Sequence, residues 1–256
     1  MHGGDHKRST TFCMQNWPEE EAGVAKIIDI SHLSLHDQVS ARLRTMLVEG
    51  RIEPGAKLNE RVLCEQLLVS RTPLREAIKL LAVEGLVDLL PNRGAVAVKL
   101  TEADVMHSFE VLAGMEAMSG ELAAERASDA ERTEIRAMHF EMMASFARRD
   151  LSAYYRLNAA IHTAINAAAR NPVLTATYAR SNARVQSLRF RTNQNETKWQ
   201  LAMHEHDLMV QALDARDAPA LRALLTTHLQ HKRDTVLELL RAGEIYPAIS
   251  ARQATR

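Results

Sequence analysis

The chain has 256 residues, of which 32 are Lys or Arg and 32 are Asp or Glu, so its formal net charge is zero. Bulk charge therefore gives no indication of nucleic-acid binding, and the low aromatic content of 4% favours helix over sheet. The sequence shows no membrane span and no signal-peptide core, and its cysteines, Cys13 and Cys64, lack metal-ligand spacing, so we expect a cytoplasmic protein.

Residues 1–30 show no sustained periodicity and are expected to form a flexible tail. Apolar residues then recur at helical spacing over residues 34–50. A second, short helix is predicted to begin near Glu60, and a third, with Pro73 in its first turn, ends at Gly85. Three short helices in close succession are thus predicted for this part of the chain.

After these helices the hydrophobic pattern changes to that of strands. Residues 86–89 and 95–98 are predicted strands, and the tetrapeptide 91–94, Pro-Asn-Arg-Gly, is typical of the turn between them. Three helices followed by a hairpin are the parts of a winged helix-turn-helix, which is the fold we predict for residues 31–99.

Beyond a linker at residues 100–104, only helical patterns are found. Short breaks divide them into six predicted helices, at 102–127, 129–149, 151–169, 172–192, 197–214 and 217–241. The expected fold class is therefore mainly α, with the winged helix-turn-helix followed by an antiparallel helical bundle over residues 105–241 and a C-terminal tail at 242–256.

The placement of basic residues indicates DNA binding. Arg71, Thr72 and Arg75 lie at the start of the third helix, where a recognition helix presents its first turn to base edges in the major groove. Arg61 begins the second helix, and Arg93 lies at the tip of the hairpin. We therefore expect these five residues to contact DNA.

The same segments resemble the GntR family of regulators. The similarity lies in Leu-Asn-Glu-Arg-Val-Leu at 58–63, Val-Ser-Arg-Thr-Pro-Leu-Arg-Glu-Ala at 69–77, the continuation 80–87, and Pro-Asn-Arg-Gly-Ala at 91–95. This resemblance implies DNA contacts from Arg61, Arg71, Thr72, Arg75 and the wing tip at Arg93 and Gly94.

Histidines in the predicted bundle point to a metal. Asn158 and His162 are four residues apart and share one helical face, while His206 and His228 lie among apolar residues of later helices. Buried imidazoles need partners, and a divalent metal satisfies three of them at once. Neutral imidazole suits Zn, Ni, Co, Mn or Fe, so the residues leave the metal's identity open.

These helices resemble the FCD-type effector domain of GntR regulators. The resemblance implies a metal held by Asn158, His162, His206 and His228 beneath a small-molecule effector. Asn158 stands where many members have Asp, and Leu112 stands where many have an arginine that meets the ligand carboxylate. Of the three arginines at 184, 189 and 191, we expect Arg189 to supply the missing charge.

The expected function is a homodimeric regulator, not an enzyme, that binds double-stranded operator DNA. The family pattern favours a repressor released by a small organic acid, a carboxylate that completes the coordination of the metal. Two alternatives remain from the residues alone. One is a helical metalloenzyme that uses the histidines with Glu205 as base, and the other is an architectural DNA binder with a structural metal.

Overall fold

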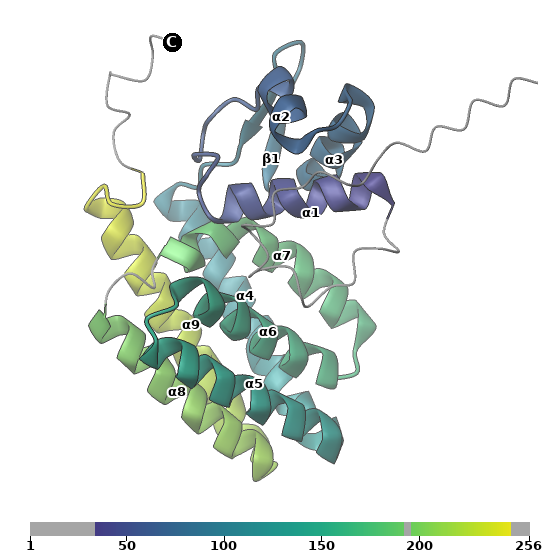
Figure 1. Ribbon diagram of the computed structural model, residues 1–256. Helices are drawn as coiled ribbons and strands as arrows, with labels where there is room; N and C mark the ends of the chain where they lie inside the picture. The colour runs from purple at the N-terminus through teal and green to yellow at the C-terminus, as the bar shows by residue number, and fades with distance from the viewer. Residues whose placement is uncertain (1–33, 192–195, 247–256) are drawn as a thin grey trace, which may run out of the picture. The chain divides into compact units, whose positions relative to one another are not determined.

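The computed structural model describes residues 34–191 and 196–246 (Figure 1). The predicted N-terminal tail and Cys13 lie outside the described residues. The mainly helical fold is confirmed, and the helix ends fall within two residues of those predicted for the bundle. The elements are α1 (Leu35–Val48), α2 (Glu60–Leu67), α3 (Arg71–Val83), β1 (Val87–Leu90), β2 (Gly94–Ala97), α4 (Glu102–Arg126), α5 (Asp129–Ala147), α6 (Leu151–Ala168), α7 (Pro172–Arg191), α8 (Glu196–Asp214) and α9 (Ala218–Arg241).

The helices α1 to α3 pack around one apolar core. Leu43, Leu74 and Leu81 are completely buried in it, which is the result expected from their helical spacing. Asn59 caps α2, because its side chain accepts hydrogen bonds from the backbone N–H groups of Arg61 and Val62. The cap fixes the start of α2, where one of the candidate DNA-binding arginines lies.

The strands β1 and β2 form an antiparallel hairpin, with Val87 opposite Ala97 and Leu90 opposite Gly94. Gly94 has a φ of 86°, in the left-handed region where glycine carries no steric penalty. The connection between α1 and α2 also pairs along β2, since the N–H of Leu58 donates to the carbonyl of Ala95 at 2.8 Å. This third segment of the wing was not predicted.

Helices α4 to α9 lie beside one another in a bundle (Figure 1). Capping boxes begin two of them: Thr101 with Asp104 at α4, and Ser128 with Glu131 at α5. In the core, Trp199 of α8 packs edge-on against Tyr154 of α6, with ring centroids 4.9 Å apart. This core holds together the helices that carry the candidate metal ligands.

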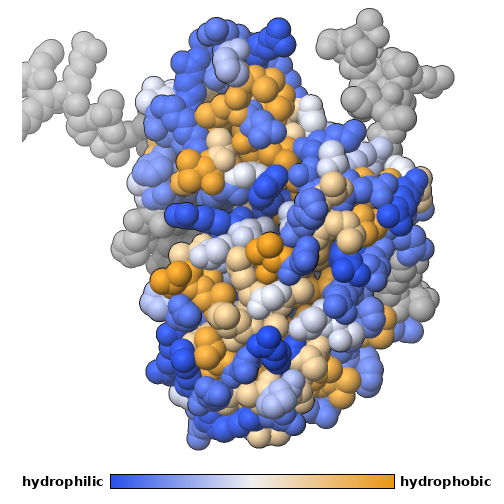
Figure 2. All heavy atoms as spheres, turned by 180° about the vertical axis from the view of Figure 1, so that it is seen from behind, coloured by the Kyte–Doolittle hydropathy of each residue, from blue (hydrophilic) through white to orange (hydrophobic). Residues whose placement is uncertain are grey.

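The surface carries both polar and apolar residues. Figure 2 shows one face, on which hydrophilic residues cover most of the area and hydrophobic residues form separate patches. On α4 the side chains of Met106, Val111 and Met118 are exposed. None of the described helices combines the length and the apolar character that crossing a bilayer requires.

Candidate DNA-binding face and metal centre

The candidate DNA-binding residues are all exposed. Arg71 and Arg75 lie one turn apart on the first half of α3, with Thr72 between them in the first turn. The hairpin turn exposes Arg93 and Gly94, and Lys57 approaches the turn closely, because a Cβ on Gly94 would lie 3.7 Å from its Cε. The start of α3 and the tip of the hairpin are thus both exposed to solvent.

Two of the candidate arginines make ion pairs with acidic residues of α2. Nε of Arg75 lies 2.9 Å from Oε2 of Glu60, and Nη1 of Arg61 lies 2.8 Å from Oε1 of Glu65. Within the described part of the chain, Arg71 and Arg93 make no ion pair. The pair between Arg75 and Glu60 joins α3 to the first residue of α2.

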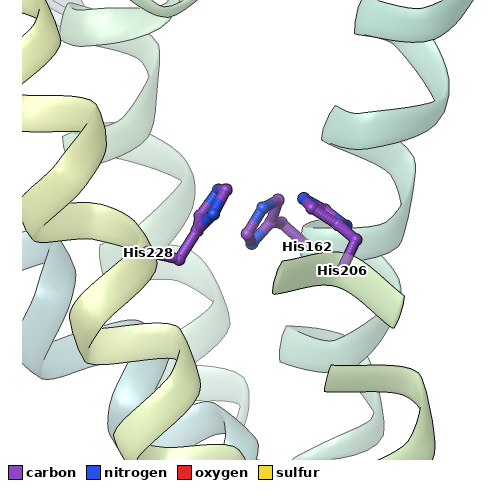
Figure 3. Close-up of side chains that lie close together, drawn as sticks. All are labelled: His162, His206 and His228. Atoms are coloured by element: carbon purple, nitrogen blue, oxygen red, sulfur yellow. The ribbon is translucent and has the colours of Figure 1, made fainter. Parts of the chain in front are cut away.

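Three histidines meet in the bundle (Figure 3). His162 of α6, His206 of α8 and His228 of α9 are at most 2% exposed, and one ring nitrogen of each lies within 4.8 Å of those of the other two. Their ring centroids are 5.0 to 5.2 Å apart. The structure therefore brings the three predicted histidines into one cluster, which we call the histidine cluster.

Several atoms of the histidine cluster are buried without a hydrogen bond. Nε2 of His162, both ring nitrogens of His206 and Nε2 of His228 have no such partner among the described residues, and neither has Oδ1 of Asn158. Burial, followed by the charges of neighbouring histidines, lowers the pKa of His206 and of His228 well below the usual range. Both imidazoles are then neutral at pH 7, which is the form that binds a metal.

Two buried carboxylates contact the outer nitrogens of this cluster. Nδ1 of His228 lies 2.6 Å from Oε2 of Glu205, and the other oxygen of Glu205 lies 2.5 Å from Nδ1 of His231. Nδ1 of His162 lies 2.7 Å from Oε2 of Glu116 on α4. A carboxylate at Nδ1 favours a proton there, so Nε2 of His162 and of His228 is left as the ligand atom.

Glu116 is held by further polar contacts. Its Oε1 accepts a hydrogen bond from the hydroxyl of Tyr178 at 3.0 Å and lies 3.3 Å from Nη1 of Arg189, which also donates to Asn182 at 2.8 Å. Burial raises the pKa of Glu116, but the opposing charges of His162 and Arg189 outweigh it and hold the pKa at about 2. Arg189 is therefore a buried cation next to the histidine cluster.

The residues at the predicted metal site fit a divalent ion. Buried polar atoms without a hydrogen bond are rare in proteins, and here six of them occur on Asn158 and the three histidines, all of them atoms of a kind that can coordinate a metal. With a metal bound, the three imidazoles and the amide oxygen would hold it and leave positions for a ligand. His204, two residues before His206, is exposed and belongs to another face of α8.

Three neighbours of the histidine cluster were not predicted as part of it. Glu116 and Lys232 are buried, on α4 and α9 respectively, and His231 shares the carboxylate of Glu205. Glu205 itself was noted only as a possible base. Of these, only Lys232 could have been found from sequence spacing. It lies four residues after His228 and therefore shares its helical face.

Comparisons with known proteins assign both parts of the chain. Residues 35–96 match the profile of the bacterial regulatory proteins of the gntR family, and residues 107–231 match the profile of the FCD domain. The Nta operon transcriptional regulator of Aminobacter aminovorans is 31% identical over 208 residues, which cover 78% of this chain and 95% of that protein. The HTH-type transcriptional repressor RspR of Escherichia coli is 24% identical over 205 residues, or 80% of this chain and 90% of that protein.

The fold is similar to solved structures. McbR/YncC of E. coli aligns with a TM-score of 0.74 at 21% identity, covering 81% of this chain and 99% of that one. A GntR regulator of Rhodococcus sp. RHA1 aligns with a TM-score of 0.67 at 20% identity, covering 79% and 97%. The chain belongs to the GntR family of bacterial regulatory proteins with an FCD domain, and is a DNA-binding transcription regulator, not an enzyme.

Proposed function

We propose that this chain is a metal-dependent repressor that a small organic acid releases from its operator. The observation that carries the proposal is the set of buried imidazole nitrogens without a hydrogen bond on three helices of the FCD domain. We assign Asn158, His162, His206 and His228 as ligands of a divalent Zn, Ni, Mn, Co or Fe ion, and Arg189 as an effector-binding residue. A carboxylate is the expected effector, since its oxygens suit the open positions of such an ion.

For DNA we assign base and phosphate contacts to the exposed face of the winged helix-turn-helix. Arg71, Thr72 and Arg75 would enter the major groove, while the start of α2 at Arg61 and the wing at Arg93 and Gly94 would contact the flanking DNA. We further propose a cytoplasmic homodimer on a palindromic operator. The exposed apolar side chains of α4 support such self-association, and light scattering at several concentrations tests it.

The test begins with selection of bound sequences from random DNA and identification of the copurifying metal by mass spectrometry. Operator affinity is then measured with and without small carboxylic acids, on metal-loaded and on chelator-treated protein. We expect acid-dependent release from the metal-loaded protein alone. If metal is bound but no ligand changes operator affinity, the chain is an architectural DNA binder with a structural metal.

Two variants of α8 provide a matched pair for the metal assignment. We expect His206→Ala to lose the metal, because His206 is completely buried in the histidine cluster, and His204→Ala to keep it, because that side chain is exposed. Equal metal content in the two variants would contradict the assignment.

A further inference from the structure

The described residues bury only four acidic or basic side chains besides histidine, and all four surround the histidine cluster. They are Glu116, Arg189, Glu205 and Lys232, from α4, α7, α8 and α9, and each is at most 8% exposed. Charged side chains are buried rarely unless they are paired. Four such residues around one cluster therefore indicate a buried site that can bind a charged ligand.

Lys232 belongs to this site by its position on α9 and by its electrostatic neighbours. It follows His228 by one helical turn on the same face, and its charge is among the causes that lower the pKa of His206 and of His228. Burial, and then the charge of Arg189, lowers the pKa of Lys232 to about 7, while Glu205 acts in the opposite direction. The charges of the two buried cations, on α7 and α9, therefore act on each other and on His228.

The turn of α4 before Glu116 contributes no cation to the site. Leu112, one turn before Glu116, is completely buried among apolar residues that include Val105, Phe109 and Leu188. The charge that α4 contributes is the carboxylate of Glu116. An anionic ligand therefore finds its protein cations on α7 and α9.

The four buried charges decide how much negative charge a ligand should carry. Two carboxylates balance the two cations when Lys232 is protonated, so the site is neutral on its own. A divalent metal adds two positive charges, and no further buried acid among the residues of known burial offsets them. Uncompensated buried charge is strongly unfavourable. A ligand that neutralises the metal-loaded site therefore carries two negative charges.

We propose that Lys232, with Arg189 beside it, is the anion-binding group of the FCD domain and that the effector is a small dianion. One anionic group of the effector binds the metal, and the other binds the ammonium of Lys232. This inference rests on the proposed metal-dependent function, and it specifies the charge of the effector and a residue that recognises it.

The test uses the full chain loaded with its metal. Probes are dicarboxylates of two to six carbons, small phosphomonoesters, and monocarboxylates of matching length, with affinities measured by calorimetry. We expect at least one dianion to bind at least about tenfold more tightly than its monoanionic match. Lys232→Met should weaken dianion binding about 10- to 100-fold at unchanged metal content, and Lys232→Arg should retain most of it. Arg180→Met, at an exposed cation of α7, is the control.

The inference is overturned if Lys232→Met binds the dianion as the wild type does, if monoanions bind equally well, or if no dianion binds. Should Lys232→Met fail to fold by circular dichroism, Lys232→Gln and the comparison of dianions with monoanions in the wild type decide instead. A wild-type chain that takes up no metal contradicts the proposed function and removes the charge argument with it. A metal-loaded chain that recognises ligands without Lys232 contradicts only this inference.

Discussion

Replacing Glu116 by Gln tests whether its buried carboxylate holds the histidine cluster. The substitution keeps the shape of the side chain but removes the charge that faces His162 at 2.7 Å and Arg189 at 3.3 Å. The pKa of Glu116 is lowered from 4.5 to about 2. At 1.36 kcal/mol per pKa unit, this shift corresponds to about 3 kcal/mol in favour of the charged form, and breaking a buried ion pair typically costs about 3–5 kcal/mol.

We therefore expect Glu116→Gln to lower the free energy of unfolding by about 3 kcal/mol, because Arg189 is left buried without its counter-charge. Urea unfolding of chelator-treated protein at pH 7 measures this change. Glu121→Gln, on the same helix, is the matched control: its pair with Arg222 is exposed, and such pairs contribute at most about 1 kcal/mol.

The same variant has a second readout in metal affinity. Removal of a carboxylate behind a ligating histidine weakens metal binding by about 10- to 100-fold, and chelator competition measures this on Glu116→Gln. If Glu116→Gln matched Glu121→Gln in both unfolding free energy and metal affinity, the positioning role of Glu116 would be refuted.

Three further predictions concern the wing, the recognition helix and Lys232. Arg71→Ala should weaken specific operator binding by about 1–3 kcal/mol and relax base preference at one operator position, measured by fluorescence anisotropy on single-base variants. Uniform weakening on all sequences would instead make Arg71 a phosphate contact. Gly94→Ala should lower stability by about 1 kcal/mol in thermal melts because of its φ of 86°, whereas Gly114→Ala, at an exposed position of helix α4, should raise it. Equal effects would contradict the strain argument. In metal-free protein the pKa of Lys232 is about 7, below its unfolded value of 10.5, so the unfolded state binds more protons between these values and stability rises with pH across that window. Lys232→Met should remove this rise in urea unfolding between pH 7 and 10, and an unchanged slope would show that other groups cause it.

The elements that were predictable from sequence are those whose pattern lies within one segment. Leu74, Ile78 and Leu81 repeat at helical spacing and are buried as that spacing requires. The pairing of the segment around Leu58 with β2 depends on backbone hydrogen bonds, which no side-chain pattern records. It therefore appeared only in the structure.

The same distinction applies to the histidine cluster. Asn158 and His162 could be placed together because both lie on one face of one helix. The contact of His162 with Glu116 joins α6 to α4, and the periodicity of either helix does not specify which residue of the other it meets. Lys232 was missed for another reason: lysine is almost always a surface residue, and its burial here follows from how α9 packs against its neighbours.

The three histidines come from α6, α8 and α9, at positions 162, 206 and 228 of the chain. A single ion bound by all three would join these helices only in the folded chain, so its binding free energy would add to the stability of the effector domain. Loss of the ion would leave His206 of α8 without any polar partner. Unlike His162 and His228, it has no carboxylate at either ring nitrogen among the described residues. In such an arrangement, the stability of the effector domain would rise with the concentration of free metal, even without an effector.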